Sequence, residues 1–150
     1  MNDALRRRAA ELNLIADDSE WLRLQLGAAC CERVRRFVEN ADVLRCLDGL
    51  QDYLAHRIDR TALAVLADTA RRLANTHPGS RSLDGSGHAA VSATYAIAQA
   101  LAGAALQAAD YAAYAAVYGD GGYGAVSDRQ SFEPEFEWQV ACLEVLARRA

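Results

Sequence analysis

The sequence predicts an all-α fold, a single-domain bundle of five to seven helices around a central alanine-rich helix. Apolar residues recur at three- and four-residue steps along most of the 150-residue chain, which is the spacing of one helix face. β-Branched residues are sparse and never alternate over the length of a strand. Alanine, the residue with the highest helix propensity, supplies 32 of the 150 residues. A chain of this length is typical of one domain, so residues 1–150 are expected to share one core.

Four helical patterns occupy the first half of the chain. They are predicted at residues 3–15, 19–40, 42–54 and 59–75. Each pattern places its large apolar residues on one side of the helix, where they can be buried against neighbours. Asp42 is the expected N-cap of the third helix, because a carboxylate oxygen there can accept a hydrogen bond from a free backbone N–H of the first turn.

Helix breakers divide the second half of the chain. Residues 77–87 are predicted to form a long loop, since Pro78 forbids helical continuation. An alanine-rich helix, or two helices broken near Gly103, should follow over residues 88–118. A glycine-rich loop is expected at residues 119–124, and the last helix should begin near Pro134, a favoured first-turn position.

The charge of the chain excludes several functions. The net charge is −4, from 16 basic and 20 acidic residues. This balance argues against binding to nucleic acid or to an anionic membrane, which needs a concentrated basic face. All 16 basic residues are arginine. The absence of lysine excludes a Walker A loop, a Schiff-base lysine and a Ser-x-x-Lys nucleophile.

The glycines of the second loop, Gly119, Gly121 and Gly124, match the pattern G-x-G-x-x-G. In a dinucleotide-binding fold this pattern follows a strand, whereas here it follows a predicted helix. A flexible loop between helices is therefore the preferred interpretation.

The cysteines and histidines show no metal-ligand spacing. Cys30, Cys31, Cys46 and Cys142 form no Cys-x-x-Cys pair and lie in apolar helical patterns, so they are expected to be unpaired, buried thiols in a reducing cytoplasm. The three histidines lack the spacing of zincins and di-iron bundles. We therefore predict no metal and no cofactor. Residues 1–8 lack the apolar region of a signal peptide, and residues 89–118 are too polar to span a bilayer, which favours a cytoplasmic location without membrane contact.

Two groups of residues are candidates for contact with a partner. The acidic group, opposed only by Arg129, comprises Asp120, Asp128, Glu133, Glu135 and Glu137. Stabilisation of a helix N-terminus explains part of this acidity. A negative surface that docks a basic protein is the functional interpretation.

The aromatic group comprises Tyr111, Tyr114 and Tyr118, which share one helix face because they are spaced by three and four residues. They can be core edges with their hydroxyl groups at the rim, or an aromatic contact patch.

Two segments resemble a known class of proteins. One runs from His88-Ala89-Ala90 through Asp110-Tyr111-Ala112-Ala113-Tyr114-Ala115-Ala116, and the other is Glu137-Trp138-Gln139 followed by Leu143 and Leu146. Together they resemble the alanine-rich, all-helical immunity proteins of bacterial polymorphic toxin systems, over roughly the C-terminal half of the chain. The resemblance implies a protein without enzymatic activity that binds and blocks a cognate toxin. Trp138 and Gln139 can belong to the interface, or Trp138 can equally be a core anchor with Gln139 as a polar handle to a neighbouring helix.

Two other functions compete with this one. The first is an enzyme or small-molecule binder with a pocket beside the alanine-rich helix, lined by Tyr111, Tyr114 and His88. The second is a purely structural or oligomerising bundle. A deep pocket in which His88 meets a carboxylate would favour an enzyme. A filled core with an exposed acidic or aromatic patch would favour partner binding.

Overall fold

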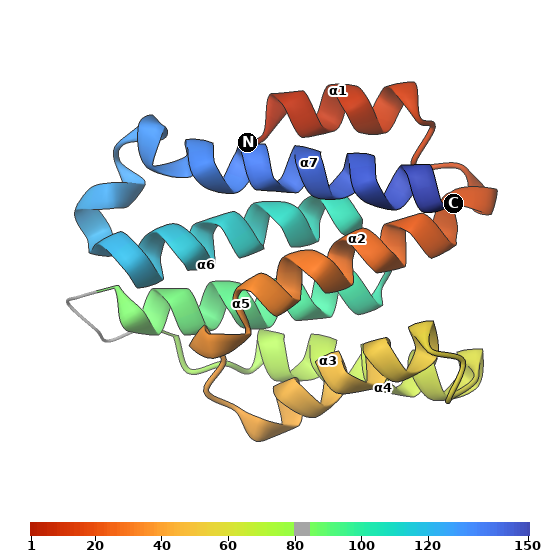
Figure 1. Cartoon of the computed structure of the whole chain (residues 1–150). Helices are drawn as coiled ribbons and strands as arrows, with labels where there is room; N and C mark the ends of the chain where they lie inside the picture. Colours follow the sequence, from red (N-terminus) through yellow and green to blue (C-terminus); the bar gives the residue numbers. More distant parts are fainter. Residues whose placement is uncertain (80–84) are drawn as a thin grey trace.

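The structure is a computed structural model that describes residues 1–79 and 85–150, and these residues form helices and turns without any strand (Figure 1). The seven α-helices are α1 (Asp3–Glu11), α2 (Glu20–Arg33), α3 (Ala41–Leu54), α4 (Arg60–Asn75), α5 (Ser86–Leu101), α6 (Ala105–Val126) and α7 (Glu133–Arg149). Short 3-10 helices precede α2 (η1, Asp17–Ser19), follow it (η2, Arg35–Phe37) and precede α7 (η3, Arg129–Phe132). The prediction of an all-α bundle of five to seven helices is confirmed.

Short polar side chains cap three of the first four helices, namely α1, α3 and α4. Asp59 accepts a hydrogen bond from the backbone N–H of Ala62 at 2.8 Å and so starts α4. The expected cap of α3 was wrong: Asn40 is the N-cap, and its Oδ1 accepts a hydrogen bond from the N–H of Asp42 at 2.7 Å. Asp42 lies instead in the first turn, where its negative charge interacts favourably with the helix dipole.

The alanine-rich segment breaks where glycine allows it. Gly103 has a φ of 77°, a left-handed conformation that costs glycine little, and it separates α5 from α6. The long loop is shorter than predicted, because α5 begins at Ser86. Residues 80–84 of that loop lie outside the described residues.

The prediction of a glycine-rich loop at residues 119–124 is wrong, because these residues continue α6. The helical backbone is interrupted only at Gly122, with φ 72° and ψ −166°. At Gly119 the reason for glycine is packing, since the ring of Phe37 occupies the space that a Cβ would need. Glycine therefore provides close contact between α6 and η2 here, rather than a turn.

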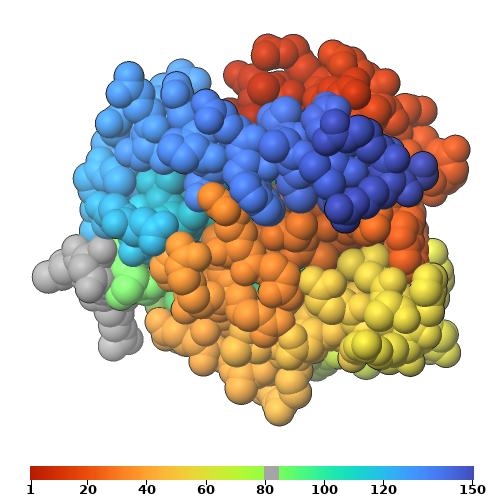
Figure 2. Space-filling model, viewed as in Figure 1, coloured from red at the N-terminus to blue at the C-terminus, as the bar shows by residue number. Residues whose placement is uncertain are grey.

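The helices form three layers. Figure 1 shows α2, α5 and α6 in the middle, the α3–α4 pair on one side, and α7 with α1 on the other. The space-filling view shows α7 in dark blue lying between α1 and α2 (Figure 2). Buried side chains from all seven α-helices belong to one connected core.

Alanine fills the interface between α5 and α6, the most extensive helix pair of the fold. The buried alanines are Ala89, Ala90, Ala93, Ala96, Ala98 and Ala100 on α5 and Ala105, Ala108, Ala109, Ala112, Ala113, Ala115 and Ala116 on α6. Helix α2 also approaches α5 closely at Gly27. A Cβ built on Gly27 would lie 3.0 Å from the Cβ of Ala100 and 3.1 Å from its Cα, closer than ordinary van der Waals contact.

The four cysteines are free thiols in different surroundings. Cys30, Cys31 and Cys46 are buried, whereas Cys142 on α7 is only partly buried. Loss of hydration raises the pKa of all four thiols. None of the helices in the described ranges combines the length and the apolar character needed to cross a membrane.

A substitution that adds a side chain at Gly27 should destabilise the bundle. We expect Gly27→Val to lower the free energy of unfolding by about 1–3 kcal/mol, because α2 and α5 must move apart. The matched control is Gly124→Val, since nothing lies within 4 Å of a Cβ at that position. The control should stay within about 0.5 kcal/mol of the wild type in chemical denaturation. Equal stability of the two variants would contradict this account of the core.

Thiol labelling should follow burial. At neutral pH a disulfide reagent should modify Cys142 first, because the thiolate is the reactive form and the other thiols are shielded. Peptide mass spectrometry after timed labelling measures the order, and Cys142→Ala should remove the fast phase. Labelling of Cys30 or Cys31 at the rate of Cys142 would show that the core opens readily.

Candidate partner-binding surface

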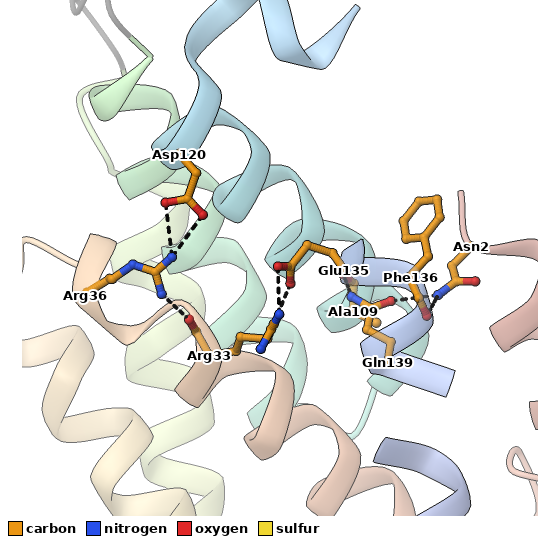
Figure 3. Close-up of polar contacts among 8 residues, drawn as sticks. All are labelled: Asn2, Arg33, Arg36, Ala109, Asp120, Glu135, Phe136 and Gln139. Atoms are coloured by element: carbon orange, nitrogen blue, oxygen red, sulfur yellow. Dashed lines mark hydrogen bonds and ion pairs between the residues drawn. The ribbon is translucent and has the colours of Figure 1, made fainter. Parts of the chain in front are cut away.

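A buried amide pair fixes α7 against α1 and α6. The side chain of Gln139 is 1% exposed, and its Nε2 donates to the carbonyl oxygen of Ala109 on α6 at 2.8 Å. Its Oε1 accepts a hydrogen bond from Nδ2 of Asn2 at 3.0 Å, and the same nitrogen donates to the carbonyl oxygen of Phe136 at 3.1 Å (Figure 3). The prediction that Gln139 is a polar handle to a neighbouring helix is confirmed.

Asn2 also starts α1. Its Oδ1 accepts a hydrogen bond from the backbone N–H of Leu5 at 3.1 Å, so this one side chain caps α1 and holds it to α7. Because the amide groups of Asn2 and Gln139 are both buried and bonded, the start of α1 has a defined position beside the middle of α7.

Two arginines at the end of α2 and in η2 bind the acidic residues of α6 and α7. Arg33 forms a two-point ion pair with Glu135, with distances of 2.7 and 3.1 Å. Arg36 contacts both carboxylate oxygens of Asp120, at 3.1 and 3.2 Å (Figure 3). The hydrogen bond to Glu135 raises the pKa of the Arg33 guanidinium. Glu135 is thereby held between α2 and α7 with its side chain 15% exposed, whereas the Arg36–Asp120 pair lies on the surface.

Trp138 lies beside this network. Its ring is partly buried against the core, as expected of an anchor, and its exposed side is covered by the guanidinium of Arg33, 4.6 Å from the ring centroid. Arg33 thus contacts Trp138 and Glu135 together and connects α2 to α7.

The outer side of α7 borders a groove of about 640 Å³, which we call the α7 groove. Its lining comes from the start of α1, from η3 and from one stripe of α7: Met1, Asn2, Asp3, Ala4, Arg129, Glu133, Phe136, Glu137, Val140 and Ala141. The α7 residues of this set recur at steps of three and four, so they share one face of the helix. Figure 2 shows the red N-terminal residues and the blue α7 segment meeting on this part of the surface.

A smaller hollow of about 240 Å³ adjoins the α7 groove, and we call it the Tyr114 hollow. It shares Met1, Arg129 and Phe136 with the groove, and the other residues that line it are Asp110, Ala113, Tyr114, Val126 and Phe132. Asp110 is already paired there with Arg6 of α1 at 2.7 Å.

The five predicted acidic residues make different contacts in the structure. Asp120 and Glu135 are held by arginines, and Asp128 caps η3 by accepting a hydrogen bond from the N–H of Gln130. Glu133 and Glu137 combine three properties that the other three acidic residues do not share. Both are exposed, both line the groove, and neither forms an ion pair within the described part of the chain.

Of the three predicted tyrosines, Tyr114 and Tyr118 remain in contact, with ring centroids 6.3 Å apart, whereas Tyr111 packs elsewhere. Tyr111 and Tyr114 are 36% and 42% exposed, whereas Tyr118 is half-buried. Tyr111 stacks on Tyr95 of α5, with ring centroids 5.3 Å apart, and Tyr114 meets the ring of Phe132 edge-on at 5.2 Å. Tyr114 is therefore the tyrosine that borders the hollow.

His88 extends this aromatic cluster through Tyr118. Its ring stacks on Tyr118 at 4.9 Å and meets Tyr123 edge-on at 4.8 Å. Of the three residues expected to line a pocket beside the alanine-rich helix, Tyr114 alone lines the Tyr114 hollow. Within residues 1–79 and 85–150, no three His, Cys, Asp or Glu side chains are grouped in a way that could hold a metal ion.

Sequence reasoning missed the apolar part of this site. Phe136 and Val140 are partly buried against the core and also border the groove, while Leu143 is fully buried. Residues 133, 136, 137, 140 and 141 are spaced by three and four, and this spacing was a usable signal that they share a second face of the last helix. Nothing in the sequence indicated that residues 1–4 form the opposite wall.

No family model, curated protein or solved structure matches the chain. The resemblance to immunity proteins therefore depends on the two segments quoted above, and the surface is interpreted from its own residues.

Removing the buried amide of Gln139 should loosen this region. We expect Gln139→Leu to lower the free energy of unfolding by about 1–3 kcal/mol, because one N–H of Asn2 loses its partner inside the protein. Gln107→Leu, at an exposed position of the same bundle, is the matched control and should change stability little. Thermal melts of both variants check this, and equal melting temperatures would contradict it.

Proposed function

We propose that the chain is a non-enzymatic binding protein of the cytoplasm, an immunity protein that neutralises a cognate bacterial toxin by docking it on the α6–α7 face. The observation that carries this proposal is the α7 groove with the Tyr114 hollow beside it, bordered by the unpaired carboxylates of Glu133 and Glu137 and by the exposed ring of Tyr114.

The residue types on this face suit contact with a protein. Interfaces combine an apolar centre with a polar rim, and tyrosine is among the residues that contribute most to binding energy. Here Phe136, Val140 and Met1 supply the apolar centre, and Glu133 and Glu137 lie at its rim. Tyr114 offers a large ring that is already oriented by Phe132, so little conformational freedom would be lost on binding.

Charge supports a basic partner. The chain has a net charge of −4, and its unpaired acidic side chains on this face would steer a positively charged toxin domain toward the groove. The resemblance of the two C-terminal segments to immunity proteins makes a toxin the partner that we propose.

The test is binding to the toxin domain encoded beside this chain's gene. Tyr114→Ala should weaken binding by about ten-fold or more, because it truncates a central aromatic contact. Tyr53→Ala is the control, since Tyr53 lies on α3 in the opposite layer. Calorimetry gives the affinity, and growth of cells that express the toxin gives protection. A toxin domain that does not bind, or that loses affinity through Tyr53→Ala alone, would contradict the proposal.

A further inference from the structure

The start of α1 leaves the first turns of α7 uncovered. Figure 1 shows α1 beginning opposite the middle of α7, so α7 extends beyond it toward η3. The hydrogen bonds from Asn2 to Gln139 and to the carbonyl oxygen of Phe136 fix this starting point. The α7 groove is therefore a preformed hollow with one wall from residues 1–4 and the other from α7.

The floor of the groove is apolar and has a helical repeat. Phe136 and Val140 lie one turn apart on α7, about 6 Å along its axis. Apolar side chains at this spacing match those of a second helix lying alongside, which places residues one turn apart at the same intervals. An extended strand places the side chains of one face about 6.6 Å apart, a slightly longer interval.

The rim of the groove carries more acidic than basic groups. Glu133 and Glu137 are also one turn apart, and like charges at this spacing repel each other. Asp3 adds a third carboxylate from α1, and the cations of the groove are Arg129 and the amino group of Met1. No ion pair neutralises Glu133 or Glu137 within the described residues, so a cationic ligand would gain attraction and relieve their repulsion.

We infer that the α7 groove receives a cationic amphipathic helix of the partner, with apolar residues on Phe136 and Val140 and arginine or lysine side chains on Glu133 and Glu137. This inference rests on the proposed function and names the part of the toxin that the face would hold. Its basis is charge complementarity on an apolar floor of helical repeat.

The probe is a labelled synthetic peptide of about 14 residues that forms an amphipathic helix of leucine, alanine and arginine. Fluorescence anisotropy measures its affinity for the full chain at two salt concentrations. We expect saturable binding that weakens as salt is raised, because screening reduces attraction between charges. A peptide of the same pattern with glutamate in place of arginine should not bind. Equal binding of the two peptides would overturn the inference.

Two variants test the location. Glu133→Gln with Glu137→Gln should weaken binding of the cationic peptide by about ten-fold, whereas Asp17→Asn with Asp18→Asn changes the net charge equally, away from the groove, and should change affinity less than about two-fold. Ala141→Arg, at an exposed groove position, should abolish binding by filling the groove and adding positive charge. Equal effects of the two double variants would overturn the inference, and melts establish that all variants are folded.

The same variants separate this inference from the proposed function. If the toxin binds and Tyr114→Ala weakens it, but the Glu133 and Glu137 variant does not, the function stands and the groove inference is overturned. If the cationic peptide binds through the groove but the toxin does not bind, the groove inference is supported and the proposed function fails.

Discussion

Side chains no larger than a methyl group allow α2, α5 and α6 to approach closely, and the other helices are arranged around this contact. Gly27 meets Ala100 where a Cβ would already be crowded, and alanine lines both sides of the α5–α6 interface. Helices so close together bury much of their backbone, whose hydrogen bonds are satisfied within each helix. Larger residues then surround the alanine-lined centre, such as Leu26 of α2 and Leu47 and Leu50 of α3, all fully buried.

Polar contacts fix the position of α7, where small residues do not. Helix α7 is held by the Gln139 amide on one side and by the Arg33–Glu135 pair on another, and each contact has a defined direction and length. Direction matters because apolar packing alone allows one helix to slide along another. A buried amide fixes the position, because burying it without a hydrogen-bond partner costs free energy. The α7 groove follows from this arrangement, since Asn2 ties α1 to the middle of α7 and leaves its first turns open.

The sequence predicted what depends on local spacing. Helix number, the break at Gly103 and the role of Gln139 all follow from periodicity, backbone freedom or side-chain chemistry. It did not predict what depends on tertiary contact. Gly119 resembled a loop residue because its packing partner, Phe37, lies far away in the chain. The acidic residues resembled one surface for the same reason, since Arg33 and Arg36 cannot be assigned to Glu135 and Asp120 before the fold is known.

Helix geometry explains why neighbouring acidic residues of α7 have different roles. Each residue turns the helix by about 100°, so residues two apart point to nearly opposite sides and residues four apart to nearly the same side. Glu135 therefore faces α2, where Arg33 holds it, while Glu133 and Glu137 face the groove together. All three lie near the N-terminus of α7, where negative charge is favourable. The helix dipole thus stabilises the two unpaired carboxylates beside the apolar floor of the α7 groove. One acidic segment can therefore support the fold on one side of the helix and present charge to a partner on the other.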